Sequence, residues 1–278
     1  MFHAVIVGID EYLDPGIPAL VCAKADAREL ARLIEQRIAK DERDVRLLLD
    51  EKATRREILT AIGDDLARRI EVNDVVMLYF ACHGSPERMS PRDRRARYVI
   101  PHDADLARIH STAINMERDV ADWLERLGDA AVLVLVLDTC FSGAAGGRTI
   151  MGPMLRANPT LLGNLDDPRP VSLSGLDLGR GRAILCAADD DQLAREDLRA
   201  GHGVFTRHFL TSLTRARDGA ALIPLTTIYE EVEAAVRSQT HGAQQPVVSV
   251  LRNRRASLPS LAARASTPSE PDSQLRIV

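Results

Sequence analysis

Runs of apolar residues alternate along the chain with segments in which apolar positions recur every three or four residues. Short apolar runs bounded by Gly, Asp or Asn are typical of buried strands, and the three-to-four spacing is typical of amphipathic helices. The pattern therefore predicts strands and helices in alternation. The expected strands are 3–9, 44–50, 73–84, 98–101, 132–138, 182–189 and 245–251, and the expected helices are 23–38, 54–70, 115–127, 203–216 and 225–239.

The main strands are apolar at nearly every position and not only at alternate ones, as in VLVLVL before Asp138. Such strands are buried on both faces, and their alternation with helices predicts an α/β fold with a mainly parallel sheet covered on both sides. Thr54, with Glu57 three residues later, forms the capping box expected at the start of a helix. In a sheet of this kind, functional groups gather at the carboxyl ends of the strands.

Two segments break the pattern. Residues 141–180 are rich in Gly, Pro, Asn and Asp and lack periodicity, which is unusual for a loop in a compact domain and indicates a functional or mobile segment. Residues 258–278 are rich in Ser, Pro and Ala with few bulky side chains, and we expect a disordered tail there.

Composition excludes several classes of protein. The net charge of −4 argues against nucleic-acid binding, and no apolar stretch approaches the roughly 20 residues that span a bilayer. The start of the chain lacks the features of a signal peptide. The four cysteines are widely spaced and suggest reduced thiols in a cytoplasmic protein, and no Cys or His spacing suggests a zinc site. We therefore expect no metal and no membrane or nucleic-acid partner.

A histidine and a cysteine follow two of the main strands. His83 lies in ACHG after the third strand, and Cys140 lies in DTCFSG after the fourth. Each residue alone is more often structural, but neighbouring parallel strands lie about 4.8 Å apart, so their ends bring the two side chains within reach. An imidazole beside a thiol lowers the pKa of the thiol and supplies a proton to a leaving amine, which is the minimum for acyl transfer.

The two motifs, YFACHGS and LVLDTCFSG, resemble those of the caspase-like cysteine peptidases, which include caspases, metacaspases and bacterial relatives. AVIVGIDEY and LVCAKADARELARLI resemble the first strand and helix of that family, and ILCAADDDQLARED with GHGVFTRHFLTSL resembles its small-subunit half. The resemblance implies a three-layer sandwich around a mostly parallel six-stranded sheet. It implies one peptidase domain over 1–257, with a large-subunit part at 1–144, a linker at 145–180 and a small-subunit part at 181–257.

The resemblance also implies catalytic roles. Cys140 would be the nucleophile and His83 the general base and then the acid, while a main-chain carbonyl orients the imidazole in place of a third carboxylate. The N–H groups of Gly84 and Cys140 would form the oxyanion hole. Metacaspases have Tyr-Ser-Gly-His-Gly before the histidine where this chain has Phe-Ala-Cys-His-Gly, so the serine of that motif is absent here.

The resemblance also implies which substrate residue the enzyme prefers. In metacaspase-like members, two acids line the pocket for the residue before the scissile bond. Asp26 and Asp138 match both positions, and two carboxylates favour Arg over Lys because Arg makes bidentate contacts. Asp189, Asp190 and Asp191 could add to the negative rim, although a solvated loop end is the simpler interpretation.

The 145–180 linker suggests self-processing. An enzyme that prefers basic residues could cut itself there, and an uncut surface loop is the alternative. The candidate cleavage residues are Arg148, Arg156, Arg169 and Arg180.

The competing hypothesis is a catalytically inactive caspase-like scaffold that binds protein partners. A phosphatase would need a Cys-x5-Arg loop and a serine hydrolase a G-x-S-x-G turn, and the chain has neither. Because no sensor domain is recognisable, activation is expected from a separate protein or ligand. Calcium is a weak alternative because there is no EF-hand-type loop, and bacterial defence is an association drawn from relatives.

Overall fold

The structure is a computed structural model that describes residues 1–88, 95–128, 130, 132–140, 181–189, 192–215, 222–250 and 257–261. Its helices and strands follow the predicted alternation. In chain order they are β1 (Phe2–Gly8), α1 (Ala23–Arg37), η1 (Lys40–Glu42), β2 (Arg43–Leu49), η2 (Asp50–Lys52), α2 (Arg55–Leu59), η3 (Thr60–Leu66), β3 (Val75–Ala81), β4 (Gly84–Arg88), β5 (Arg95–Val99), η4 (Leu106–Arg108), α3 (Ile109–Thr112), β6 (Ile114–Asn115), α4 (Asp119–Arg126), β7 (Val132–Asp138), β8 (Arg182–Cys186), β9 (Glu196–Asp197), β10 (His202–Gly203), α6 (Val204–Thr214), β11 (Leu222–Pro224), α7 (Leu225–Thr240), β12 (Val247–Val250) and β13 (Ser257–Pro259).

The main sheet has six strands in the order β12-β8-β7-β3-β1-β2. All neighbours pair in parallel except β12, which is antiparallel to β8. The predicted mostly parallel six-stranded sheet is therefore confirmed. The strand order places β3 and β7 side by side at the centre, where both are buried on both faces.

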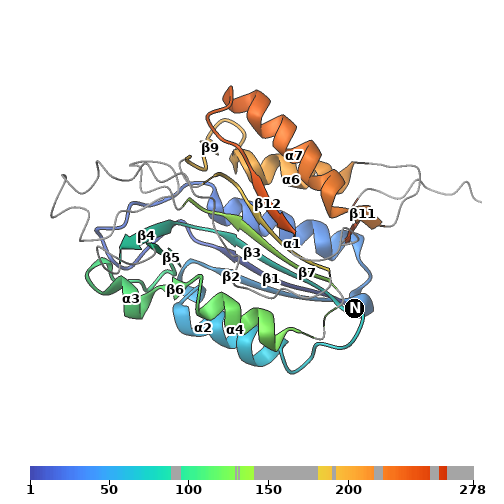
Figure 1. The fold of residues 1–278 in the computed structure, drawn as a ribbon, viewed down its shortest axis with the longest axis horizontal. Helices are drawn as coiled ribbons and strands as arrows, with labels where there is room; N and C mark the ends of the chain where they lie inside the picture. Colours follow the sequence, from blue (N-terminus) through green and yellow to red (C-terminus); the bar gives the residue numbers. More distant parts are fainter. Residues whose placement is uncertain are drawn as a thin grey trace, which may run out of the picture.

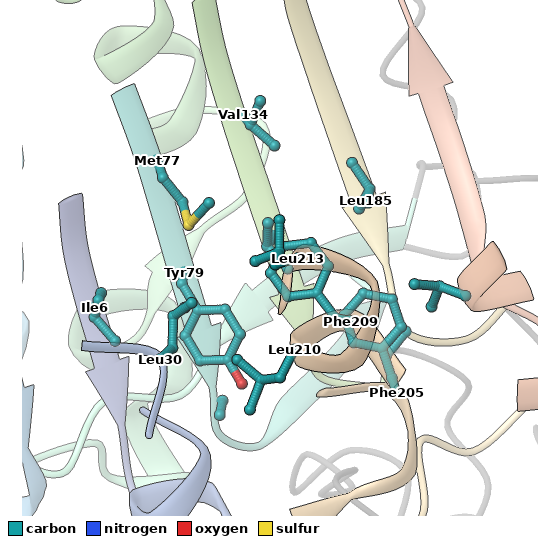
Figure 2. Packing of buried hydrophobic residues seen from close by; sticks show 14 of the residues in the cluster. Ile6, Leu30, Met77, Tyr79, Val134, Leu185, Phe205, Phe209, Leu210 and Leu213 are labelled. Atoms are coloured by element: carbon teal, nitrogen blue, oxygen red, sulfur yellow. The ribbon is translucent and has the colours of Figure 1, made fainter. Parts of the chain in front are cut away.

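Helices cover both faces of this sheet, which gives the predicted three layers. Figure 1 shows α1, α6 and α7 on one face and α2 and α4 on the other. The helices of each face bury their own hydrophobic cluster against the sheet. Figure 2 shows the first cluster, in which Met77, Tyr79 and Val134 of the strands meet Leu30 of α1 and Phe209 of α6.

The end of β1 and the start of α1 approach each other closely at Gly8. A Cβ atom at this position would lie 2.5 Å from Cβ of Ala27 and 2.7 Å from the carbonyl oxygen of Ala23. Real Cβ atoms do not come this close to other heavy atoms, so only glycine fits here. The contact fixes the first turn of α1 against the carboxyl end of the sheet.

The helix predicted over 54–70 begins as expected but changes its geometry. The Thr54 side chain accepts a hydrogen bond from the backbone N–H of Glu57 at 3.2 Å, as in a capping box. After the five residues of α2 the chain continues as the π-helical η3. This helix ends at Leu66, earlier than predicted. Apolar spacing cannot distinguish these two helix types over so few turns.

The fold extends beyond the expected start of the tail at Leu258. β13 pairs antiparallel with β11, and Leu258 and Leu261 are both buried in the cluster beneath α6 and α7. Residues 258–261 are therefore part of the folded domain and not of a tail. The two leucines lie in a stretch rich in Ser and Pro, and the prediction of a tail was based on that composition.

Candidate active site

His83 and Cys140 follow the two central strands at equivalent positions. Ala81 of β3 is the register partner of Asp138 of β7, and His83 and Cys140 each come two residues later. Cys140 packs in the same hydrophobic cluster as Ala81. Both side chains are buried, with 1% of each residue exposed. The register thus brings the predicted histidine and cysteine to one edge of the sheet.

Two contacts from the loop after β1 hold His83. Its Nε2 atom lies 2.8 Å from the carbonyl oxygen of Pro18, and its backbone N–H donates to the hydroxyl of Tyr12 at 2.9 Å. The Tyr12 ring also packs against the imidazole, with 5.3 Å between the ring centroids. Since a carbonyl only accepts, the neutral imidazole carries its proton on Nε2 and presents the lone pair of Nδ1.

The loop that carries Tyr12 and Pro18 is itself anchored at both ends by Asp10. The Asp10 carbonyl accepts the N–H of Leu20 at 2.9 Å, and its carboxylate accepts the N–H of Ala23 at 2.9 Å. Burial raises the pKa of the Asp10 carboxyl, and hydrogen bonds from the backbone of Lys24 and Ala23 oppose that rise. The position of the Pro18 carbonyl is therefore fixed by the start of α1.

The Cys140 thiol contacts the backbone of Ala194, in the segment between β8 and β9. The sulfur accepts the N–H of Ala194 and lies 3.7 Å from the carbonyl oxygen of the same residue. Buried Gln244 holds this segment in place, because its side chain accepts the N–H of Arg195 at 3.0 Å and donates to the carbonyl of Ala187 at 2.9 Å. The described conformation covers the thiol.

The backbone N–H of Gly84 takes no part in the β4–β5 ladder. Ile100 donates its N–H to the carbonyl of His83 at 3.0 Å, and Gly84 is the register partner of Val99 in the antiparallel pair β4–β5. Hydrogen-bonded and non-hydrogen-bonded pairs alternate in such a ladder. The N–H of Gly84 therefore points away from β5.

Asp138 is fully buried and hydrogen-bonded to α6. The Thr206 hydroxyl donates to its carboxylate at 2.6 Å, and the Tyr79 hydroxyl lies 2.5 Å from the same Thr206 oxygen. Because Thr206 has one hydroxyl hydrogen, Tyr79 donates to Thr206 and Thr206 donates to Asp138. The tyrosine appears in Figure 2 within the hydrophobic cluster, so this hydrogen-bonded chain crosses an apolar layer.

Asp26, in the first turn of α1, is also fully buried. Its carboxylate lies 2.8 Å from Nδ1 of His202 and accepts the N–H of Gly203 at 2.9 Å. The hydrogen bond from Asp26 raises the pKa of His202, and its partial burial opposes that rise. Gly203 caps α6 and Thr206 is its third residue, so one helical turn contacts both predicted pocket acids.

The remaining predicted site residues are not brought into this arrangement. Asp189 is partly buried at the end of β8, and its charge contributes to raising the pKa of Tyr229, for which burial is the main cause. A pocket of about 600 Å³ lies between the β9–β10 hairpin and the end of α7, lined by residues 195–199 and 239–241 with Val204, and it includes none of the predicted catalytic residues. Asp190, Asp191, Arg148, Arg156, Arg169 and Arg180 lie outside the described residues.

Among the residues that the structure describes, no group of three or more His, Cys, Asp or Glu side chains could hold a metal ion. The helices in the described ranges include none that is long and apolar enough to cross a membrane. None of the four cysteines, all of them described, forms a disulfide. All four are buried, and Cys82, beside the histidine, packs in the hydrophobic cluster under α2 and α4.

Comparison with known proteins identifies the family. The family model described as the caspase domain, peptidase family C14, matches residues 1–256. The chain belongs to the caspase family. The caspase domain thus covers nearly the whole chain, and the chain has the scaffold of a cysteine peptidase.

Solved structures show the same fold. The crystal structure of protein GSU0716 from Geobacter sulfurreducens aligns with a TM-score of 0.63 at 19% identity, over 89% of this chain and 92% of that one. None of the curated proteins matches the chain. At this identity the likeness to a solved structure concerns the fold alone.

Several residues of the site were not predicted from the sequence. Tyr12 and Pro18 follow β1 at the functional edge, and that position is the signal that could have identified them. His202 lies 176 residues along the chain from its partner Asp26, and Thr206 lies 68 residues from Asp138. No local sequence pattern predicts those two contacts.

Proposed function

We propose that this caspase domain is a cysteine endopeptidase that uses Cys140 and His83 and cuts peptide bonds after Arg or Lys. The observation that carries the proposal is the shared register of β3 and β7, whose ends lie together at one edge of the sheet and are followed by His83 and Cys140. The His83–Pro18 hydrogen bond supports it, because it fixes the tautomer whose other nitrogen can accept a proton.

The proposed reaction is acyl transfer in two steps. Nδ1 of His83 takes the thiol proton of Cys140, and the sulfur attacks the scissile carbonyl carbon to form a tetrahedral oxyanion. The N–H groups of Gly84 and Cys140 would stabilise that oxyanion. The imidazolium then gives its proton to the leaving amine, and the thioester remains on Cys140. A water molecule, deprotonated by His83, hydrolyses the thioester and returns the thiol. These steps need no metal or cofactor.

Asp26 and Asp138 are proposed to select the basic residue before the scissile bond. Two buried carboxylates held by one turn of α6 make a strongly negative site, which suits a guanidinium or ammonium group. Aspartate at that substrate position would meet like charge and is rejected.

The described conformation is proposed to be a resting state. Cys140 is buried against Ala194, and both acids have no exposed surface. A substrate can reach the thiol only after Ala194 moves away from it, so we propose that a separate activator protein or ligand drives that movement. An inactive scaffold is the alternative, but such scaffolds usually lack the catalytic Cys or His, and both are present here.

Fluorogenic peptides that differ only in the residue before the scissile bond test the proposal. Wild-type protein is expected to cleave Arg best, then Lys, and not Asp. Cys140→Ala and His83→Ala should abolish cleavage, and Asp138→Ala should remove the preference for Arg. Cleavage after Asp, or equal activity in Cys140→Ala, would contradict the assignment.

Self-processing within 145–180 is a separate part of the proposal. Cys140→Ala protein, incubated with wild type under activating conditions, should yield fragments of about 16 and 12 kDa, as segment length gives. Replacing Arg148, Arg156, Arg169 and Arg180 together by Gln should leave that substrate intact. An uncut chain in the presence of peptidase activity would show that the segment is not a substrate.

A further inference from the structure

His202 already occupies one of the two proposed specificity acids. Its Nδ1 atom lies 2.8 Å from Oδ1 of Asp26, a carboxylate with no exposed surface. A buried carboxylate is stabilised by a paired cation, and a basic substrate side chain would need the same oxygen atoms. The internal histidine and a substrate cation are therefore competitors for Asp26.

We propose that His202 is an internal competitor that is displaced from Asp26 when an Arg or Lys side chain binds. This inference rests on the proposed function, because it concerns the same two acids. Binding would exchange one cation for another beside Asp26, while Asp138 stays held by Thr206. A basic side chain replaces the charge of the imidazolium and a neutral side chain does not, so the exchange favours a cation as the ligand.

The geometry allows this exchange without loss of the fold. The His202 side chain is 27% exposed, so it can turn toward solvent. The β9–β10 hairpin that carries it is held independently, because the Glu196 carboxylate accepts the N–H of Cys22 at 2.8 Å and the N–H of Val21 at 3.3 Å. The backbone N–H of Gly203 also continues to donate to Asp26. Releasing the imidazole therefore breaks one contact among several.

The charges around His202 set the direction of the pH dependence. Asp26 and Glu29 of α1 favour its protonated form, Arg207 of α6 opposes it, and Asp197 is its register partner in the hairpin. Where His202 is protonated, a substrate cation has to displace an imidazolium from Asp26. Binding of a basic peptide therefore releases a proton and strengthens as the pH rises through the raised pKa of His202.

The test measures binding to the full-length Cys140→Ala protein, in which nothing turns over. The probes are two peptides that differ only in Arg or citrulline, its neutral isostere, at the position before the scissile bond. Isothermal titration at several pH values should show that Kd for the Arg peptide falls by up to about tenfold per pH unit, the limit for one released proton. Titrations in two buffers of different ionisation enthalpy measure the number of protons released on binding.

His202→Gln in the same background keeps a side-chain donor but removes the charge. It should flatten the pH profile, abolish the proton release and tighten binding of the Arg peptide at low pH, because the competing imidazolium is gone. His208→Gln is the matched control, because His208 lies half-buried on α6 and contacts Gln239 instead of a carboxylate. It should behave as the parent protein does.

Identical pH profiles with and without His202 would overturn the inference, as would equal affinity for the two peptides. Cleavage assays with wild-type protein report separately on the proposed function. Cleavage after Arg with an unchanged profile in His202→Gln would remove the role of His202 alone. Failure to cleave together with failure to bind the Arg peptide would overturn both proposals.

Discussion

The hydroxyl oxygen of Tyr12 lies 2.9 Å from the backbone nitrogen of His83 and accepts its N–H. The tyrosine therefore positions the proposed base through its main chain, while Pro18 orients the imidazole through its ring. A base positioned from both sides keeps its orientation while the thiol and the leaving group come and go.

Tyr12→Phe removes this hydrogen bond and keeps the ring. We expect kcat to fall about fivefold with KM little changed, because a lost hydrogen bond of about 1 kcal/mol affects the orientation of the base and not the binding of the peptide. Steady-state kinetics on an Arg peptide measures both constants. Tyr229→Phe, on α7, is the matched control and should leave kcat unaltered. An unchanged kcat in Tyr12→Phe would exclude a positioning role.

Thr206→Val tests the buried chain from Tyr79 to Asp138. The substitution takes a hydrogen-bond donor from a fully buried carboxylate and an acceptor from a buried phenol, and we expect the free energy of unfolding to fall by about 1–3 kcal/mol. Chemical denaturation measures this change. Thr206→Ser should restore most of the stability, and Thr211→Val, on the exposed side of α6, should have little effect. Equal stability of the two valine variants would speak against the hydrogen-bonded chain.

Stability should also depend on pH through His202. The pKa of His202 is raised in the folded chain above its ordinary value of 6.5 by the hydrogen bond with Asp26. Its contribution to stability is therefore complete below pH 6.5 and is lost as the pH rises through the higher folded pKa. The difference in free energy of unfolding between wild type and His202→Gln should shrink across that window. A constant difference would mean that the contact is uncharged.

Gly8→Ala should disrupt the approach of β1 to α1. A methyl group would lie 2.5 Å from Cβ of Ala27, so the helix has to shift, and we expect a loss of about 1–3 kcal/mol in thermal or chemical unfolding. Gly63→Ala is the contrasting variant, because its nearest neighbour is Trp123 at 3.9 Å. That helical substitution should be neutral or stabilising by about 0.5–1 kcal/mol. A Gly8→Ala protein as stable as wild type would refute the close contact.

Gln244→Ala should expose the thiol more often. The side chain of Gln244 makes two hydrogen bonds that hold the segment over Cys140. Their loss, at about 0.5–1.5 kcal/mol each, should raise the rate of Cys140 alkylation by iodoacetamide about tenfold, as mapped by mass spectrometry. Gln245→Ala is the control, because the hydrogen bond of Gln245 uses its backbone N–H. Equal alkylation rates would show that Gln244 does not hold the cover.

The sequence predicted the sheet because its strands are apolar at every position, and it predicted His83 and Cys140 because both follow such strands. It also placed Asp138 on the face of Cys140 from the two-residue period alone. It did not predict that Asp26 and Asp138 would be buried and bound to α6. Those contacts join segments far apart in the chain, and their geometry depends on how a helix packs, which periodicity does not specify. The end of the fold was missed for a related reason, since Leu258 and Leu261 are buried by elements that precede them.

The order of the strands has a consequence for a chain opened between Cys140 and Gly181. Both residues of the proposed dyad would remain on the first fragment, while His202, Thr206 and the cover at Ala194 would belong to the second. The two fragments would stay joined through the β7–β8 pairing and the apolar layer between α1 and α6. Severing the backbone there would divide the molecule covalently, yet the two pieces would still migrate as one particle in size-exclusion chromatography.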